Sequence, residues 1–500
     1  GRYRASFEFA ERATGIDLMA GPWVIREKIM SRAIGAPLRL RTYFSRELDA
    51  VTGLADGYLD DSRRYLELYG EEIGAYPFTE FSVVASPLPT GFGMPTLTYM
   101  GAEVLKLPFI RATSLGHEVL HNWWGNGVYV DYPTGNWSEG LTTFMADYAY
   151  KDRESAEAAR AMRLGWLRDF AAVPAGNTQS LASFRSRTHG AAASVGYGKS
   201  AMLFVMLRDA IGEDAFRRGI RTFWEQHRFR LASWSDLQAV FETAAGRSLA
   251  SFFEQWLKRP GGPAVKIAHA GAKREAGRVR LTLTVEQSAP PYAMRLPLEI
   301  VFPGSVVTRS IDIGRQRDVV TVDVDALPEG VRLDPDLRVW RVLEREQLPP
   351  ILRQWVIARA PRLVQVSSVG DVREAAMLLS KRFFETPAQA ASQDALNQGT
   401  EPTLLVGLHA DVDAALARAG LPPRPVSLAG RGSAQAWTIA RAAGPPVAVV
   451  SAKDADALRA LLGPLPHYGA QSWLVFDDRR ALDRGVWPAP GRLIAVQDDR

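Results

Sequence analysis

The sequence predicts a multidomain α+β protein, and three observations support this fold class. The chain has 500 residues, whereas a single hydrophobic core rarely serves more than about 250–300 residues, so we expect about three domains. The hydrophobic period is largely helical over 138–260 and becomes two-residue alternation after that. Towards the C-terminus, strand-like and helix-like segments follow one another in turn, which is typical of an α/β sheet.

Composition narrows the class of protein. Hydrophobic residues make up 47% and charged residues 23% of the chain, as in ordinary soluble globular proteins. A net charge of +5 without a dense basic block does not indicate nucleic-acid binding. The absence of cysteine excludes disulfides, thiol catalysis and cysteine-ligated zinc. Because no apolar run reaches about 18 residues, we expect no integral membrane segment. Export to the periplasm or cell envelope and a cytoplasmic location both stay open.

The N-terminal part is predicted to pass from strands to helices. Residues 1–40 alternate like short strands, and we expect them to be the remnant of an N-terminal β domain with its entry strands. A helical stripe follows over 47–74, then the strand-like "EFSVVASPL" and the Gly/Pro-rich "PTGFGMPTLTYMG". Amphipathic helical runs continue to "KRPGGPAV", where Pro and Gly end them. Residues 41–260 therefore form one predicted domain.

The C-terminal half is predicted to hold two further domains. Short alternating segments over 261–345 predict a β-sandwich, and 346–362 a linker. Residues 363–500 predict an α/β domain of unknown role, in which "SAQAWTIARAAG" is expected to be helical. The glycines of "AGRGSAQAW" precede it without the Lys-Ser/Thr end of a phosphate loop, so we expect a plain strand–helix connection there.

The stretch "HEVLHNWWGN" holds two of the seven histidines of the chain. His117 and His121 are four positions apart, so on a helix they share one face and can present two imidazole nitrogens to one cation. Glu118 lies beside them, able to polarise a water without binding the metal. This is the arrangement of the H-E-x-x-H signature of zinc hydrolases.

Two ligands do not hold a catalytic zinc, which has three protein ligands and a water. The other histidines are scattered and cysteine is absent, so a carboxylate from another helix is the natural third ligand. In "NWSEGLTTFMADYAY", Asn136 or Ser138 can cap a helix, and Glu139 follows in its first turn. Taken alone, such a glutamate is more often a simple helix-dipole partner.

Together, "HEVLHNWWGN" and "NWSEG" resemble the aminopeptidase N family of gluzincin zinc metallopeptidases. The resemblance implies a thermolysin-like catalytic domain over 41–260, with His117, His121 and Glu139 as ligands of Zn²⁺ and Glu118 as the general base. Residues 122–138 leave one position fewer between the motifs than is usual in the family. The turn-like "YPTG" at 132–135 can absorb that difference.

The same family carries a tyrosine before an apolar helix, in a Y-x-K-G-like segment, that stabilises the oxyanion formed during hydrolysis. "VGYGKSAMLFVML" is similar in character and position, which implies this role for Tyr197. On its own, a tyrosine near glycines is more often a packing residue.

The substrate segment departs from the family pattern. A G-x-M-E-N segment normally provides the backbone that pairs with the peptide and the glutamate that binds its free amine. Here "GFGMPT" retains Gly91, Gly93 and Met94, our candidate substrate-binding residues, but has Pro95 at the glutamate position. We expect removal of N-terminal residues from peptide substrates by a water on the zinc that Glu118 activates. The alternatives are an endopeptidase acting on short peptides without need of a free amine, and a non-catalytic interaction protein on this fold.

Overall fold

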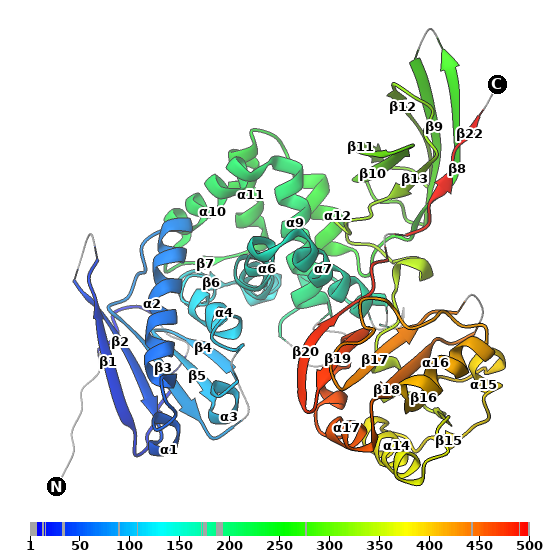
Figure 1. Ribbon diagram of the computed structural model, residues 1–500. Coiled ribbons are helices and arrows are strands. Elements are labelled where there is room, and N and C mark those ends of the chain that lie inside the picture. The colour runs from blue at the N-terminus through cyan, green and yellow to red at the C-terminus, as the bar shows by residue number, and fades with distance from the viewer. Residues whose placement is uncertain are drawn as a thin grey trace. The chain divides into compact units, whose positions relative to one another are not determined.

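A computed structural model of the chain describes residues 8–12, 15, 17–32, 36–88, 91–107, 109–171, 173, 178–186, 194–275, 278–441, 444–489 and 491–498 (Figure 1). The chain divides into two compact units. The first contains Gly1–Leu343 together with Leu493–Arg500, and the second is Glu344–Arg492. Among the described residues no helix is both long and apolar enough to cross a membrane.

The first unit begins with a five-stranded sheet in the order β1-β2-β3-β5-β4. Both edge strands run antiparallel to their neighbours, whereas β2, β3 and β5 are mutually parallel. In β2 alternate side chains are buried, which shows one face packed against helix α2 and the other partly exposed. The strands are β1 (Val24–Met30), β2 (Leu38–Phe44), β3 (Glu80–Ser86), β4 (Gly91–Met94) and β5 (Leu97–Gly101), and the helices beside them are α1 (Arg46–Asp49), α2 (Leu54–Glu72) and α3 (Ala102–Leu105).

A helical region follows the sheet (Figure 1). Local sequence explains several of its boundaries: Ser233 and Asp236 form a reciprocal capping box at the start of α11, and Gly246 ends it at φ 65°. The helices are α4 (Ser114–Leu120), α5 (Ser138–Thr142), α6 (Ala149–Glu154), α7 (Ala156–Ala171), α9 (Ser200–Ile211), α10 (Glu213–His227), α11 (Trp234–Ala245) and α12 (Ala250–Lys258). The region also has π-helices η2 (Thr143–Tyr148) and η5 (Ser194–Lys199), 3₁₀ turns η1 (Tyr132–Thr134) and η4 (Leu181–Ser183), and paired strands β6 (Tyr129–Val130) and β7 (Leu231–Ala232).

The rest of the first unit is a β-sandwich with sheets β11-β10-β13-β21 and β12-β9-β8-β22. One edge strand of each sheet comes from residues 494–498, which follow the second unit in sequence and pair with β13 and β8. The second unit is thus inserted into the sandwich sequence rather than appended after it. The strands are β8 (Val265–Glu275), β9 (Arg278–Gln287), β10 (Met294–Phe302), β11 (Ser305–Ile313), β12 (Arg317–Val324), β13 (Gly330–Leu333), β21 (Ile494–Ala495) and β22 (Gln497–Asp498).

The second unit is a three-layer α/β domain around a seven-stranded sheet in the order β15-β14-β16-β18-β17-β19-β20. One core lies between the sheet and α14 and α17, and a second core lies beneath α16. The strands are β14 (Arg362–Gln365), β15 (Gln389–Ala390), β16 (Thr403–Leu408), β17 (Ala434–Ile439), β18 (Val447–Ala452), β19 (Trp473–Asp477) and β20 (Arg480–Gly485). The helices are α13 (Arg353–Val356), α14 (Gly370–Phe383), α15 (Ala395–Gln398), α16 (His409–Arg418) and α17 (Ala455–Ala460), with 3₁₀ turns η6 (Arg345–Gln347) and η7 (Leu465–Tyr468).

One local prediction for this unit is wrong. The segment "SAQAWTIARAAG" was expected to be helical, yet its first half forms β17, which is buried throughout and lies between β18 and β19. Small residues and helical periodicity suggested a helix, but Trp437, Thr438 and Ile439 fit a central strand, and tertiary packing decides between such alternatives. The preceding glycines therefore lead into a strand and form neither a phosphate loop nor a strand–helix connection.

Candidate metal centre and active site

Helix α4 carries the first two candidate ligands. His117 lies within it and His121 is its C-terminal cap, whose backbone N–H donates to the carbonyl of His117 at 3.2 Å. The two imidazole rings lie 4.9 Å apart, centroid to centroid. Leu115, Val119 and Leu120 are buried, so the apolar positions anchor the helix and turn the two histidines to its half-buried side.

Helix α2 fixes the position of this short helix. Three tyrosines of α2 donate hydrogen bonds to backbone carbonyls along the segment that leads into α4: Tyr58 to Leu105 (2.9 Å), Tyr65 to Arg111 (3.0 Å) and Tyr69 to Gly116 (3.1 Å). A seven-residue helix is only marginally stable by itself. Satisfying these buried carbonyls therefore both docks α4 and sets its register against α2.

Glu139 lies in the first turn of α5, just after Ser138, whose backbone N–H donates to Oδ1 of Asn136 at 3.1 Å. Its Oε2 atom is 3.7 Å from Nε2 of His117 and 3.7 Å from Nε2 of His121. The three residues offer ligand atoms within 4.8 Å of one another, and they are the one such group found among the described residues. The structure thus brings together the three ligands suggested by the sequence.

The other ring nitrogen of each histidine has its own partner. His117 Nδ1 lies 2.6 Å from Oδ2 of Asp147, and His121 Nδ1 lies 3.0 Å from the carbonyl oxygen of Trp124. With both Nδ1 atoms engaged in this way, the Nε2 atoms remain for a metal and point to Glu139. Such outer partners fix the tautomer and orientation of a ligating histidine and raise its basicity.

Sequence reasoning missed Asp147. It lies eight residues after Glu139, a spacing that places two side chains about 80° apart on a regular α-helix, within one broad face. The π-helix η2 intervenes, and its wider turns change the angular relation between the two acids. An acid about two turns after Glu139 is the signal that could have found Asp147 in the sequence.

The motif segments are also tied to each other. Ser138 Oγ donates to the carbonyl of Trp124 at 2.8 Å, the same oxygen that faces His121. Trp124 and Trp137 are fully buried and pack edge to face with centroids 6.3 Å apart, and Trp137 Nε1 donates to Ala232. The tryptophans of the two motifs therefore hold α4 and α5 together behind the metal ligands.

Electrostatics favour a charged Glu139. Burial raises the pKa of this carboxyl group, but His121 and His117 outweigh burial, and with the hydroxyl of Tyr197, which hydrogen-bonds to it, they lower the pKa to about 2. Tyr197 belongs to π-helix η5, and its ring packs edge-on to Phe184 at 6.4 Å. Tyr197, which the sequence also predicts for the site, thus lies beside Glu139.

Edge strand β4 passes directly over the H-E-x-x-H helix. A Cβ atom built on Gly93 would lie 2.8 Å from Cβ of His121 and 2.9 Å from Oε2 of Glu118, and one on Gly91 would lie 3.3 Å from Oε1 of Glu118. The glycines therefore allow the closest approach of this strand to Glu118. Met94 closes the strand, paired with Leu97 of β5.

The altered segment forms the tip of the β4–β5 hairpin. Pro95 and Thr96 are its two loop residues, and Thr96 has φ 68°. Proline followed by a residue with positive φ is the pattern of a type II turn. The backbone N–H of Thr96 donates to the buried Asn122, just after α4, at 2.9 Å. Position 95 is thus a turn residue without a carboxylate beside the site.

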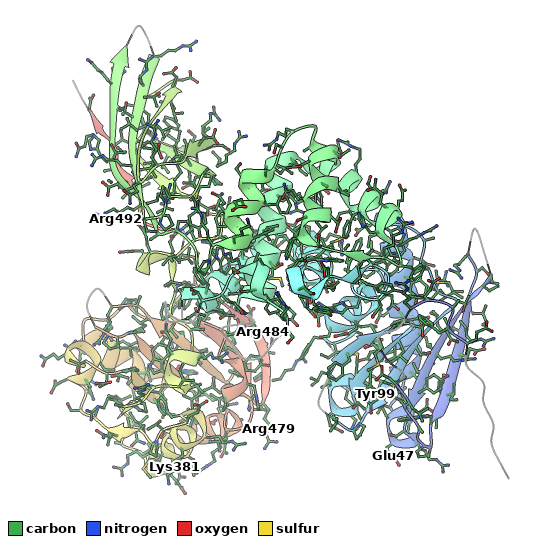
Figure 2. The ribbon with its side chains drawn as sticks, turned by 180° about the vertical axis from the view of Figure 1, so that it is seen from behind. Glu47, Tyr99, Lys381, Arg479, Arg484 and Arg492 are labelled. Atoms are coloured by element: carbon green, nitrogen blue, oxygen red, sulfur yellow. The ribbon has the colours of Figure 1, made fainter. Side chains whose placement is uncertain are left out.

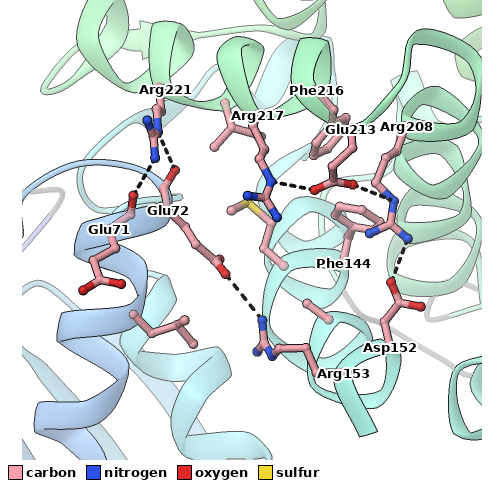
Figure 3. Close-up of a pocket in the computed structure, with 14 residues that line it drawn as sticks. Glu71, Glu72, Phe144, Asp152, Arg153, Arg208, Glu213, Phe216, Arg217 and Arg221 are labelled. Carbon is pink, nitrogen blue, oxygen red and sulfur yellow. Dashed lines mark hydrogen bonds and ion pairs between the residues drawn. The ribbon is translucent and has the colours of Figure 1, made fainter. Parts of the chain in front are cut away.

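A cavity adjoins π-helix η2, with a volume of about 610 Å³ and with Phe144 and Met145 in its wall (Figure 3). Its arginines are all paired, and their partners are Arg153–Glu72 (3.4 Å), Arg208–Asp152 (2.8 Å), Arg217–Glu213 (2.7 Å) and Arg221 with the carbonyls of Glu71 and Glu72 (2.9 and 3.3 Å). These bonds connect α2, α6, α9 and α10 around the helix that carries Asp147.

Comparison with known proteins supports the resemblance seen in the sequence. Residues 111–256 match the model of the Peptidase family M1 domain. This match agrees with the resemblance of the region to the aminopeptidase N family of gluzincin metallopeptidases. The predicted domain over 41–260, which contains the match, is called the M1 domain below. The relatives of this M1 domain include tricorn protease-interacting factor F2 of Thermoplasma acidophilum, 26% identical over 243 residues, and leucyl aminopeptidase of Saccharolobus solfataricus, 26% identical over 247 residues.

These matches cover 43% and 46% of this chain but only 30% of each relative. A crystal structure of Legionella pneumophila aminopeptidase A in complex with aspartic acid superposes with a TM-score of 0.50 at 15% identity, covering 73% of this chain and 42% of that one. At this identity the likeness concerns the fold alone. It agrees with the multidomain α+β class predicted from the sequence, which is confirmed.

Proposed function

We propose that this M1 domain is a zinc-dependent peptidase that removes N-terminal residues from peptides. The observation that carries the proposal is the convergence of His117 Nε2, His121 Nε2 and Glu139 Oε2, with both Nδ1 atoms held by other groups. Two histidines and one glutamate are a known ligand set of catalytic zinc in peptidases.

The donor set fits zinc in spacing as well as in chemistry. Metal–ligand distances of about 2.0–2.2 Å at tetrahedral angles separate the ligand atoms by about 3.4 Å. Oε2 of Glu139 is 3.7 Å from each Nε2. These two spacings are therefore within a few tenths of an ångström of those expected around a tetrahedral zinc ion. When bound, zinc supplies Lewis-acid activation of a water and of the scissile carbonyl.

Glu118 and Tyr197 would perform the remaining steps. Glu118 is adjacent to His117 on α4 but outside the ligand group, so its carboxylate can take the proton of the attacking water and later pass it to the leaving amine. Tyr197 hydrogen-bonds to Glu139, and its hydroxyl would donate to the developing oxyanion. We infer that Gly91, Gly93 and Met94 of edge strand β4 pair with the backbone of the peptide, because an edge strand offers unpaired N–H and C=O groups.

Loss of the metal tests the first part of the proposal. Dialysis against a chelator should abolish hydrolysis of an aminoacyl-coumarin substrate, and added Zn²⁺ should restore it. Glu118→Gln should keep the bound zinc and lose several orders of magnitude in kcat. If neither the parent nor the Gln variant hydrolyses the substrate above background, the M1 domain serves as a non-catalytic interaction module instead.

The turn at Pro95 favours one alternative in particular, an endopeptidase that acts on short peptides. A free α-amine needs a carboxylate partner to be held beside the metal, and position 95 has none. The deciding measurement is kcat/KM for one peptide with a free and with an N-acetylated amino terminus. An aminopeptidase loses most of its activity on the acetylated form, whereas equal values would establish the endopeptidase.

A further inference from the structure

A cavity of about 740 Å³ lies in the second unit, at the carboxyl ends of β16 and β18. The register of these parallel strands pairs Leu408 with Ala452, so the residues that follow, His409 and Lys453, are neighbours at the same sheet edge. Both residues line the cavity. Ligands of α/β proteins bind outside the carboxyl ends of parallel strands, and all the residues that line this cavity belong to the second unit.

A nearly buried arginine organises the wall of this cavity. The side chain of Arg424 is only 8% exposed, and it donates to Oγ of Ser451 (2.6 Å), to Asp413 (2.9 Å), to the carbonyl of His409 (3.2 Å) and to the side chain of Gln435. These four bonds use the N–H groups of both terminal nitrogens. Arg424 therefore holds the wall in place and has little capacity left for a ligand.

The network also orients His409. Because arginine can only donate, Oγ of Ser451 accepts from Arg424, and its own hydrogen is available to Nδ1 of His409 at 3.0 Å. The proton of the neutral ring then resides on Nε2, which becomes a donor. Burial, together with the charge of Arg424, lowers the pKa of His409, in agreement with a neutral ring.

The cavity also offers hydrogen-bond donors that no described residue uses, and its charged side chains sum to a net positive charge. Asp413 is neutralised by Arg424, whereas the exposed Lys453 has no ion pair or side-chain hydrogen bond within the described part of the chain. Gly430 and Gly432 line the cavity with φ of 70° and 63°, and their N–H groups donate to no described residue. Free donors beside an uncompensated cation favour an anion.

We propose that this cavity binds a small organic anion through its phosphate or carboxylate group. Lys453 and Nε2 of His409 would bind the anionic group, and the apolar wall of Ala417, Leu421 and Pro423 would contact the rest of the ligand. Lys453 and Arg424 together carry one more positive charge than Asp413 removes, so a metal cation is disfavoured at this cavity.

Calorimetric titration at constant ionic strength tests the proposal with phenyl phosphate, benzoate and, as a neutral control, benzyl alcohol. One or both anions should bind saturably in the millimolar range or tighter, and their relative affinities distinguish the phosphate from the carboxylate. Lys453→Ala should weaken binding about tenfold, the usual loss for one charge-assisted hydrogen bond, and Lys453→Arg should retain most of it.

Lys381→Ala is the matched control, because Lys381 is an exposed lysine of the same unit on α14, outside the cavity lining (Figure 2). It should bind the anions as the parent does, and all variants should unfold at the same temperature. The proposal is overturned if neither anion binds saturably, if benzyl alcohol binds as well as the anions, or if Lys453→Ala binds them as tightly as the parent.

Discussion

Replacing Gly93 by alanine tests the inferred fit between strand β4 and helix α4, which carries His117 and His121. The added methyl group would lie 2.8 Å from Cβ of His121 and 2.9 Å from Oε2 of Glu118. Carbon atoms in contact prefer about 3.5–4.0 Å, so strand and helix must separate by about 0.7 Å or more. The Cβ atom of His121 cannot move away without moving the helix, whereas the carboxylate at the end of Glu118 can rotate. The strain therefore falls mainly on His121, a proposed metal ligand, and also turns Glu118, the proposed general base.

The expected loss follows from this displacement. A misplacement of about 1 Å in a catalytic group can cost about 100-fold in rate, so we expect kcat/KM to fall by about two orders of magnitude. Overpacking should cost about 1–3 kcal/mol of stability. Gly93 does not have a positive φ, so backbone strain does not contribute.

Gly91→Ala is the matched control, since its methyl group would lie 3.3 Å from Oε1 of Glu118 and touch nothing closer. Glu118 needs to move by only a few tenths of an ångström to accommodate this methyl group. Alanine also has fewer conformations than glycine in the unfolded chain, which favours folding by about 0.4–1 kcal/mol. We expect less than about tenfold loss of activity at Gly91 and little change in stability.

The assay is steady-state hydrolysis of an aminoacyl-coumarin substrate, with zinc content and thermal unfolding measured on the same preparations. Zinc content separates displacement of His121 from displacement of Glu118. The reasoning is refuted if Gly93→Ala keeps the activity of the parent, or if Gly91→Ala loses as much as Gly93→Ala.

Three further predictions concern other parts of the M1 domain. Asp147→Asn should weaken zinc binding about 10–100-fold, measured by competition with a chelator, because His117 loses its anionic partner. Burial lowers the pKa of Lys199 to about 7, so between about pH 7 and 10 the unfolded chain binds one proton more than the folded protein. The free energy of unfolding should therefore rise with pH in this range, by up to about 1.4 kcal/mol per pH unit. Lys199→Met should flatten this slope when urea unfolding is measured across the range. Pro95→Glu should raise the ratio of kcat/KM for free over N-acetylated peptides, and an unchanged ratio would mean that the turn keeps the new carboxylate away from the amine.

The candidate metal ligands were accessible from the sequence because the geometry of the first two is local. The four-residue spacing of His117 and His121 fixes their relation within one helix. Glu139 needed one more assumption, that two helix ends meet, and its resemblance to a family motif provided it. The predicted residues do lie together, with Glu139 3.7 Å from both histidines.

Sequence alone determined the fold class and the residues able to hold a metal, because hydrophobic period and residue type are properties of the chain itself. Tertiary structure decided how these residues are held. The pairing of His117 with Asp147 joins α4 to π-helix η2, and the close approach of Gly93 to Glu118 depends on a strand laid across a helix. The return of 494–498 to the sandwich and the polar wall around Arg424 are equally non-local. Each joins segments whose separation in sequence carries no periodic signal, so only packing brings them together.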